Sequence, residues 1–233
     1  MRIGNPTRVN EKMLSFTYER RFASHPAYPA LYNTRKNIRD PFDDKLGYLT
    51  QCPTNLGTGM RASVMLHLPA LEKSRTIGRI AGNLSKLGLT IRGAYGEGSE
   101  PSGSLYQLSN QVTLGISEKA AIENLENITK QLVSQERQAR ERLAKSIDIQ
   151  DSVSRSLGLL KSAMVMTHDE ALKLLSNVRF GILSGQIKDV TAEVVDSLME
   201  KIEPATLMVN SGKNLSAQER DIERAKILRE ALS

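Results

Sequence analysis

The chain has 233 residues, of which 39% are hydrophobic and 25% are charged. A chain of this length and composition can bury one substantial core or two smaller ones, which excludes a disordered or collagen-like protein. Its net charge of +6 comes almost entirely from the first 42 residues, which hold eight Lys and Arg and three Asp and Glu. We therefore expect no direct nucleic-acid partner for the remainder of the chain.

The sequence contains neither a membrane-span pattern nor a metal-binding pattern. It has no run of about 18 uncharged apolar residues, and its N-terminus lacks the apolar core of a secretory signal. The single cysteine, Cys52, cannot form an internal disulfide, and three scattered histidines give no zinc-ligand spacing. We expect a cytoplasmic protein with no membrane partner and no structural metal.

Residues 1–44 differ in composition from the rest of the chain. Six of the ten Phe and Tyr residues and four of the eight prolines lie before residue 43, and the prolines interrupt any long helix. No hydrophobic period of 2 or 3.6 residues persists there. We interpret this segment as an atypical basic head that is irregular or disordered. It is either a poorly packed extension or a basic arm that contacts an acidic partner.

Residues 45–143 mix strands with helices. Apolar residues predict strands at 62–68, 90–95 and 106–114, and their helical spacing predicts a helix over 71–87. The strands do not alternate regularly with helices as in a doubly wound parallel sheet. The pattern therefore predicts an α+β fold.

After Ser117 the hydrophobic pattern is helical throughout. Two pairs of residues are typical of capping boxes ahead of apolar helix faces: Thr167 with Glu170, and Ser216 with Glu219. We expect a long helix after Ser117 to connect the α+β part, 45–143, to an all-helical part, 144–233.

Two arginines lie where predicted strands meet loops. Arg61 closes a Gly-rich turn that has neither the Gly-Lys-Ser/Thr ending of a P-loop nor the third glycine of a dinucleotide fingerprint, and Arg92 opens a second turn. Two guanidinium groups on loop edges suit a polyphosphate, because each donates bidentate hydrogen bonds and keeps its charge. The same spacing also suits ordinary surface arginines paired with carboxylates.

Cys52 and Glu97 lie near these arginines in the sequence. A thiol near positive charge can be held as a thiolate, which would make Cys52 reactive, but a lone cysteine is also commonly buried and inert. Glu97 adds a carboxylate to the turn that Arg92 opens. The residues alone leave both alternatives open for Cys52.

Three strings around Cys52 resemble the signature of the phosphagen (guanidino) kinases, which transfer the γ-phosphate of ATP to a guanidinium nitrogen. The strings are Gly47-Tyr48-Leu49-Thr50, Cys52-Pro53-Thr54-Asn55-Leu56-Gly57-Thr58-Gly59 and Arg61-Ala62-Ser63-Val64. The segment Gly96-Glu97-Gly98-Ser99-Glu100 and the helical C-terminal part narrow the resemblance, which spans residues 45–233, to the bacterial protein arginine kinases. The resemblance implies an incomplete phosphagen-kinase-like catalytic domain, an antiparallel sheet with flanking helices, followed by a helical regulatory domain.

The resemblance implies roles for individual residues. Glu97 matches the catalytic carboxylate that orients the target guanidinium, and Cys52 matches the reactive cysteine beside it. Arg61 and Arg92 match arginines that bind the phosphates of ATP, with Mg²⁺ held by the nucleotide and water. The residues that match the two nucleotide-binding stretches are Arg61, Ala62, Ser63, Val64 and Met65, and Arg92, Gly93, Ala94, Tyr95, Gly96 and Glu97.

Residues 1–44 depart from the family pattern. They contain neither the upstream basic residues that bind nucleotide nor the Asn-Glu-Glu-Asp-His-like segment that supplies the second catalytic carboxylate. We therefore expect a truncated or diverged kinase that phosphorylates arginine weakly or not at all. The alternative function is a catalytically impaired, non-enzymatic module that binds phosphoarginine.

The last predicted helix carries Arg220, Asp221 and Arg224. Their spacing alone is typical of a solvated charge run. They also match the Arg-Asp-x-x-Arg-Ala motif with which protein arginine kinases bind phosphoarginine allosterically. An arginine near a helix N-terminus suits the phosphate, and an aspartate suits the guanidinium.

The resemblance also implies partners. It predicts a homodimer, an activator protein, a heat-shock repressor among the protein substrates, and the Clp unfoldase and protease machinery. These partners belong to the bacterial stress response and to protein quality control.

Overall fold

The computed structural model describes residues 42–94 and 101–233, together with the backbone of residues 16–20. The chain divides into two compact units. The first unit contains the described residues up to Leu66, with Ile77–Arg92 and Tyr106–Ser134, and the second contains His67–Thr76, Gly93–Leu105 and Gln135–Ser233.

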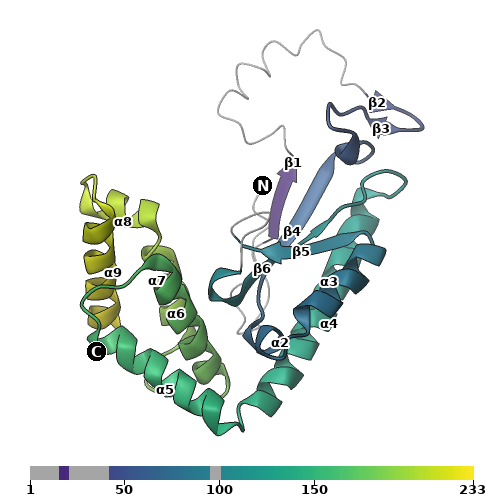
Figure 1. Ribbon diagram of the computed structural model, residues 1–233. Coiled ribbons are helices and arrows are strands. Elements are labelled where there is room, and N and C mark those ends of the chain that lie inside the picture. The colour runs from purple at the N-terminus through teal and green to yellow at the C-terminus, as the bar shows by residue number, and fades with distance from the viewer. Residues whose placement is uncertain (1–15, 21–41, 95–100) are drawn as a thin grey trace. The chain divides into compact units, whose positions relative to one another are not determined.

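A four-stranded sheet is the main feature of the first unit (Figure 1). Its strands, in spatial order, are β1 (Phe16–Arg20), β4 (Met60–His67), β6 (Leu105–Asn110) and β5 (Leu89–Gly93). β1 is antiparallel to β4, with Phe16 opposite Val64. Along β4, buried residues alternate with half-exposed ones, so one face of the strand joins the core and the other is partly accessible.

A small two-stranded sheet precedes the main sheet in the chain. β2 (Phe42–Asp43) is antiparallel to β3 (Gly47–Tyr48). The Asp43 carboxylate accepts the N–H groups of Lys45 and Leu46 at 2.8 and 2.9 Å, and the Phe42 ring packs edge-on against Tyr48 at 5.1 Å between ring centroids. Local hydrogen bonds and one aromatic pair therefore hold this hairpin.

Two helices belong wholly or partly to the first unit. These are α3 (Ile77–Lys86) and the N-terminal part of α4 (Glu118–Leu143). Ala121, Leu125 and Leu132 on α4 are buried, as the apolar stripe predicts. The long helix expected after Ser117 is confirmed.

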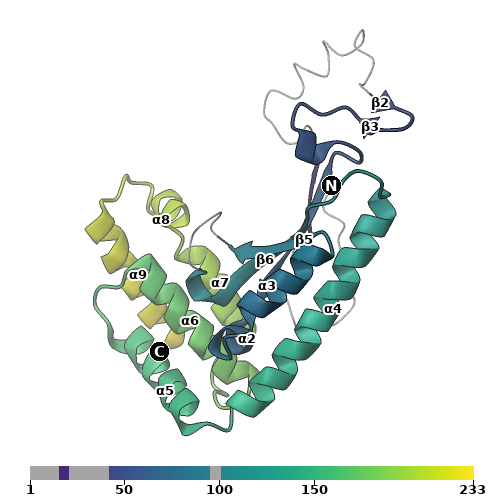
Figure 2. The same cartoon turned by 45° about the vertical axis from the view of Figure 1, so that its right-hand side comes forward.

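The second unit is mostly helical, with α6 at its centre. Its elements are α2 (Pro69–Lys73), the 3-10 turn η3 (Ser102–Ser104), α5 (Ile147–Ser162), α6 (His168–Leu183), α7 (Ala192–Lys201), α8 (Pro204–Ser211) and α9 (Ala217–Leu232). α6 packs against α5, α7, α2 and η3, and α9 packs against α5 and α8 (Figure 2). Leu175, Val178 and Phe180 of α6 are completely buried. This pattern explains why α6 is apolar around most of its circumference.

The two predicted capping boxes differ in the structure. Ser216 accepts the N–H of Glu219, and the Glu219 carboxylate accepts the N–H of Ser216 in return. Thr167 accepts the N–H of Glu170, and within the part of the chain that the structure describes only the Ser216 box carries both bonds. Both residues start helices as predicted.

Three elements differ from the expectations. The helix predicted over 71–87 is split into α2 and α3, and Arg75 between them has a positive φ of 55°. The strand predicted over 106–114 ends at Asn110, beyond which Val112 and Leu114 are about half exposed. The head that we interpreted as irregular contains β1, which gains its hydrogen bonds from β4 rather than from a local pattern.

The fold class is confirmed as α+β. The domain limits at residues 44 and 143 stay a prediction. In the described part of the chain no helix is both long and apolar enough to cross a membrane.

Candidate functional site

The Gly-rich turn folds back on the segment that follows β6. Gly57 has a φ of 106°, and a Cβ atom at this position would lie 2.1 Å from the Thr113 carbonyl oxygen, so only glycine fits. The Gly57 carbonyl accepts the N–H of Tyr48 at 2.7 Å, and Thr58 donates its N–H to Thr113 at 2.9 Å. The path of the turn is therefore fixed on both sides.

The Thr113 side chain holds the 3-10 helix η2 (Pro53–Asn55) and the residue that follows it. Its side chain is 4% exposed, and its hydroxyl lies 2.7 Å from the Leu56 carbonyl oxygen and 3.1 Å from that of Thr54. A buried hydroxyl needs such acceptors. Thr113 therefore holds the residues that connect Cys52 to the Gly-rich turn.

Arg61 is anchored through two of its guanidinium nitrogens. Nε donates to Oδ1 of Asn55 at 3.3 Å, and Nη1 donates to the carbonyl oxygen of Asn110 at 3.2 Å. Among the described residues, Nη2 has no hydrogen-bond partner. Arg61 is half-buried, so it presents N–H donors from a fixed position, which suits an anionic ligand.

Asn110 is the buried residue behind Arg61. It is 3% exposed, its Oδ1 accepts the N–H of Ala62 at 2.7 Å, and its Nδ2 donates to the carbonyl oxygens of Met60 and Val112, each at 3.1 Å. These bonds clamp β6 to β4 on either side of Arg61. Sequence reasoning missed Asn110, although it continues the buried positions of the strand two residues after Leu108, where a polar side chain is a signal.

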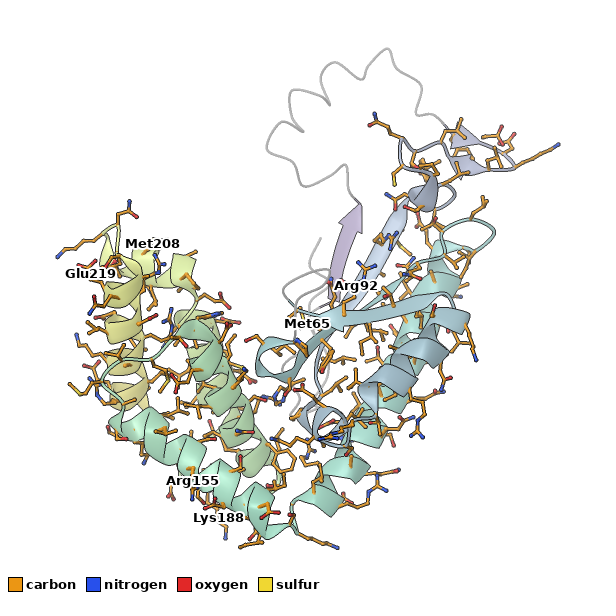
Figure 3. All side chains as sticks on the ribbon, viewed as in Figure 1. Met65, Arg92, Arg155, Lys188, Met208 and Glu219 are labelled. Atoms are coloured by element: carbon orange, nitrogen blue, oxygen red, sulfur yellow. The ribbon has the colours of Figure 1, made fainter. Side chains whose placement is uncertain are left out.

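The nucleotide-binding stretch predicted on β4 divides between the two faces of the strand. Ala62 and Val64 are buried in the core, and Arg61, Ser63 and Met65 lie on the half-exposed face. Figure 3 labels Met65 on this face. Ser63 accepts a hydrogen bond from Gln107 on β6 at 3.0 Å. Only the half-exposed residues can offer side chains to a ligand, and the other two offer packing.

The second predicted stretch begins on β5. Arg92 is exposed on this strand (Figure 3), Gly93 ends it, and the N–H of Ala94 donates to the carbonyl oxygen of Leu105 at 3.0 Å. β6 lies between β4 and β5, so the strands of the two predicted phosphate-binding arginines are roughly 10 Å apart. Three further predicted residues of this stretch lie outside the described residues: Tyr95, Gly96 and Glu97.

Cys52 is exposed and immediately precedes η2. Its Sγ lies 3.1 Å from Oγ1 of Thr54, and its carbonyl oxygen accepts a hydrogen bond from Thr50 at 2.7 Å. The expectation of a buried cysteine is therefore wrong, and the reactivity of Cys52 stays a prediction. The exposed thiol follows β3 and lies three residues before Asn55, which anchors Arg61.

The motif on α9 is built around a buried arginine. Arg224 is 1% exposed. Its Nε donates to the carbonyl oxygen of Ile202 at 3.1 Å, and its Nη1 donates to Met166 O at 2.8 Å and to Oδ1 of Asp221 at 2.5 Å. The interpretation of a solvated charge run is therefore wrong for Arg224, which joins α9 to the end of α7 and to the α5–α6 connection.

Arg220 and Asp221 remain accessible on the same helix. Arg220 is half-buried, and its Nη1 donates to the carbonyl oxygen of Leu215 at 3.0 Å. Its Nε and Nη2 have no partner within the described ranges. The Asp221 side chain is 26% exposed, and its backbone oxygen accepts the N–H of Met166 at 3.1 Å. The structure thus brings all three motif residues together at the start of α9.

Two other features of the described residues do not coincide with the predicted site. A hollow of about 500 Å³ in the first unit is lined by Phe42, Tyr48, Leu114 and neighbours, and by none of the predicted site residues. Across 42–94 and 101–233 there is no group of three His, Cys, Asp or Glu residues arranged to hold a metal ion. The predicted catalytic and nucleotide-binding residues that the structure describes lie on β4, on or next to β5 and beside the Gly-rich turn, outside the lining of this hollow.

Comparisons with known families match most of the chain. Residues 28–139 match the model described as "ATP:guanido phosphotransferase, C-terminal catalytic domain". Residues 146–233 match the model described as "Protein-arginine kinase McsB C-terminal domain". The first match contains Cys52, Arg61 and Arg92, and the second contains Arg220 and Arg224.

Curated relatives agree with these models. A protein-arginine kinase of Halothermothrix orenii is 52% identical over 194 residues, which cover 82% of this chain and 56% of that protein. One of Clostridium novyi is 48% identical over 199 residues, which cover 84% of this chain and 58% of that protein. The chain thus spans a little over half the length of these relatives. The two family models and the two relatives agree, and the chain belongs to the protein-arginine kinases of the ATP:guanido phosphotransferase family.

Proposed function

We propose that the chain carries the nucleotide-binding part of an ATP-dependent protein arginine kinase, which transfers a phosphoryl group to arginine side chains of proteins. The observation that carries the proposal is the anchoring of Arg61 by Asn55 and Asn110. Phosphoryl transfer depends mainly on positioning and on neutralising charge. A guanidinium that is already fixed loses little side-chain entropy when it binds a phosphate.

The other candidate residues fit this chemistry. Arg92 is an exposed cation on the same sheet, and Cys52 offers an accessible thiol near the turn that holds Arg61. Glu97 is proposed to orient the target guanidinium, on the resemblance alone. When bound, Mg²⁺ would neutralise charge on the ATP phosphates and would be held by those phosphates and water.

We propose a second function for the helical part, the binding of phosphoarginine at the start of α9. The observation that favours it is the partial exposure of Arg220 and Asp221 beside Arg224, which is buried and hydrogen-bonded. Arg220 supplies N–H donors for a phosphate, and the exposed edge of the Asp221 carboxylate supplies an acceptor for a guanidinium. This function does not require catalysis by the same chain.

Family membership also supports a cellular setting. We propose that the chain acts in the bacterial cytoplasm, in the stress response and protein quality control. Its proposed partners are a second copy of itself, an activator protein, a heat-shock repressor as substrate, and the Clp unfoldase and protease machinery.

The kinase proposal is tested by transfer of γ-labelled phosphate from ATP to a basic protein. A phosphorus–nitrogen bond is hydrolysed by acid, whereas a phosphate ester on serine or threonine survives the same treatment. We expect slow transfer of acid-labile label that is lost in Arg61→Met and retained in Arg155→Met, a matched exposed arginine on α5. Acid-stable label, or transfer that is unaffected by Arg61→Met, would contradict the proposal.

The binding proposal is tested by calorimetric titration of free phosphoarginine, with arginine and phosphate as controls. Charge-assisted hydrogen bonds contribute about 1.5–3 kcal/mol, so Arg220→Ala should weaken binding about tenfold or more. Arg155→Ala should leave binding unchanged. No binding to the wild-type chain, or equal binding to both variants, would show that α9 does not read phosphoarginine.

A further inference from the structure

A buried polar network connects the end of β4 to α6 and α7. Nε2 of His67, the last residue of β4, lies 2.8 Å from the Ser176 hydroxyl, and its Nδ1 lies 3.2 Å from Nη1 of Arg179. Arg179 is 5% exposed and pairs with Asp196 of α7, with Nε–Oδ1 and Nη2–Oδ2 distances of 2.7 and 3.4 Å. All of these residues belong to the second unit.

The network fixes the protonation state of His67. A guanidinium only donates hydrogen bonds, so Nδ1 of His67 must accept from Arg179, and the ring proton must lie on Nε2, which donates to Ser176. Burial, and then the positive charges of Arg179 and Arg140, hold the pKa of His67 well below its usual range. His67 is therefore a neutral, oriented link and not a second cation beside Arg179.

The same helix also holds the turn that precedes β6. Ser102 donates its hydroxyl to Oδ1 of Asp169 on α6 at 3.2 Å. Gly103 has a φ of 62°, and a Cβ atom there would lie 3.0 Å from the Leu172 carbonyl oxygen. The N–H of Leu68, which follows His67, donates to the carbonyl oxygen of Ser104 at 2.9 Å. α6 therefore contacts both chain segments that extend from the sheet into the second unit.

His67 shares a face of β4 with the candidate nucleotide-binding residues. Side chains two apart on a strand point to the same side, so the imidazole of His67 lies on the side of β4 that also carries the side chains of Arg61, Ser63 and Met65. Replacing a buried ion pair with apolar residues is often neutral for stability. A gain in stability therefore does not explain the bidentate pair of Arg179 and Asp196. The pair is better explained by its geometry, which fixes the orientation of the Arg179 guanidinium and of the groups that it contacts.

We propose that Arg179 is a positioning residue that, through His67, orients the half-exposed face of β4 and so makes ATP affinity depend on the helical part of the chain. The inference rests on the proposed function, because it assumes that ATP binds to the half-exposed face of β4. In this proposal α6 does more than pack against its neighbours, because Ser176 and Arg179 of α6 hold His67 at the end of β4.

The test uses the full chain and a double variant, Arg179→Met with Asp196→Leu. Removing both partners avoids leaving an uncompensated buried charge. The matched control is Arg155→Met with Asp151→Leu, which removes an ion pair of 2.6 Å between two exposed side chains of α5. Figure 3 labels Arg155 on this helix. Two quantities are measured: amide hydrogen exchange across the chain, and the ATP dissociation constant by calorimetry.

We expect the double variant to exchange faster at residues 66–72 and 102–106 while α9 keeps its protection, and to bind ATP about tenfold more weakly. The control variant should match the wild type in both measurements. Faster exchange throughout α9 as well would show a general structural role and overturn the proposal. Faster exchange only at residues 66–72 and 102–106 with unchanged ATP affinity would also overturn it. If the wild type does not bind ATP, the proposed function fails, and unchanged exchange at residues 66–72 would separately refute the link to α6.

Discussion

Replacing Arg224 with methionine should destabilise the helical part more than any change to an exposed arginine. The guanidinium is almost completely buried and donates to three acceptors, on Ile202, Met166 and Asp221. Methionine keeps much of the apolar stem but offers no donor. The variant therefore isolates the hydrogen bonds from most of the packing.

The magnitude follows from the groups that lose a partner. Each buried carbonyl oxygen left without a donor costs about 1–3 kcal/mol, so the oxygens of Ile202 and Met166 together account for about 2–6 kcal/mol. The Asp221 carboxylate is 26% exposed, so water replaces part of what it loses. Breaking a buried ion pair typically costs about 3–5 kcal/mol, which agrees with this range.

The assay is thermal unfolding followed by far-ultraviolet circular dichroism. For a chain of this size each kcal/mol shifts the melting temperature by about 2–4 °C. A loss of about 3–5 kcal/mol therefore predicts a fall of roughly 6–20 °C. Arg155→Met, whose partner Asp151 is also exposed, should cost no more than about 0.5 kcal/mol. Equal melting temperatures for the two variants would refute the reasoning.

Other expected outcomes concern backbone strain, pH and the anchor of Arg61. Gly103→Ala and Gly115→Ala both place alanine at positive φ, but of the two only the Cβ atom at position 103 would approach the backbone of α6. The Gly103→Ala variant should therefore have the lower melting temperature. Because the pKa of His67 is depressed in the fold, the unfolded chain binds the extra proton. Unfolding free energy in urea should therefore fall as the pH drops below about 6.5, and less so in His67→Asn. Burial raises the pKa of Glu136 on α4, so its contribution to the free energy of unfolding should fall as the pH rises above about 4.3, a trend that Glu136→Gln should lack. Asn110→Ala should weaken ATP binding in calorimetry without removing Arg61, and unchanged affinity would contradict the role of the anchor.

Much of the fold could be predicted from local patterns. β4 alternates between apolar and half-exposed residues, and its predicted range lies within two residues of the observed one. α4 has a long apolar stripe, and Ser216 forms the full capping box that its sequence indicates. β1 could not be predicted in this way, because the structure describes it through its pairing with β4, which lies far away in the sequence.

In the candidate site, too, the features that depend on neighbouring residues could be predicted, and the contacts between residues far apart in the sequence could not. The Gly-rich turn and the position of Arg61 follow from the sequence around Cys52, and Gly57 has the backbone conformation that requires glycine. The anchoring by Asn110 depends on how β6 lies against β4. The burial of Arg224 depends on carbonyl oxygens from α7 and the α5–α6 connection. Spacing along one helix cannot reveal either contact.

The most direct test of the account is calorimetric titration of Mg-ATP into the wild-type chain, Arg61→Met and Arg155→Met. The account predicts that the wild type and Arg155→Met bind with equal affinity. It also predicts that Arg61→Met binds at least about tenfold more weakly, because the anchored guanidinium supplies charge-assisted hydrogen bonds to the phosphates. Affinity that is the same in all three chains would contradict the claim that the half-exposed face of β4 is the nucleotide site.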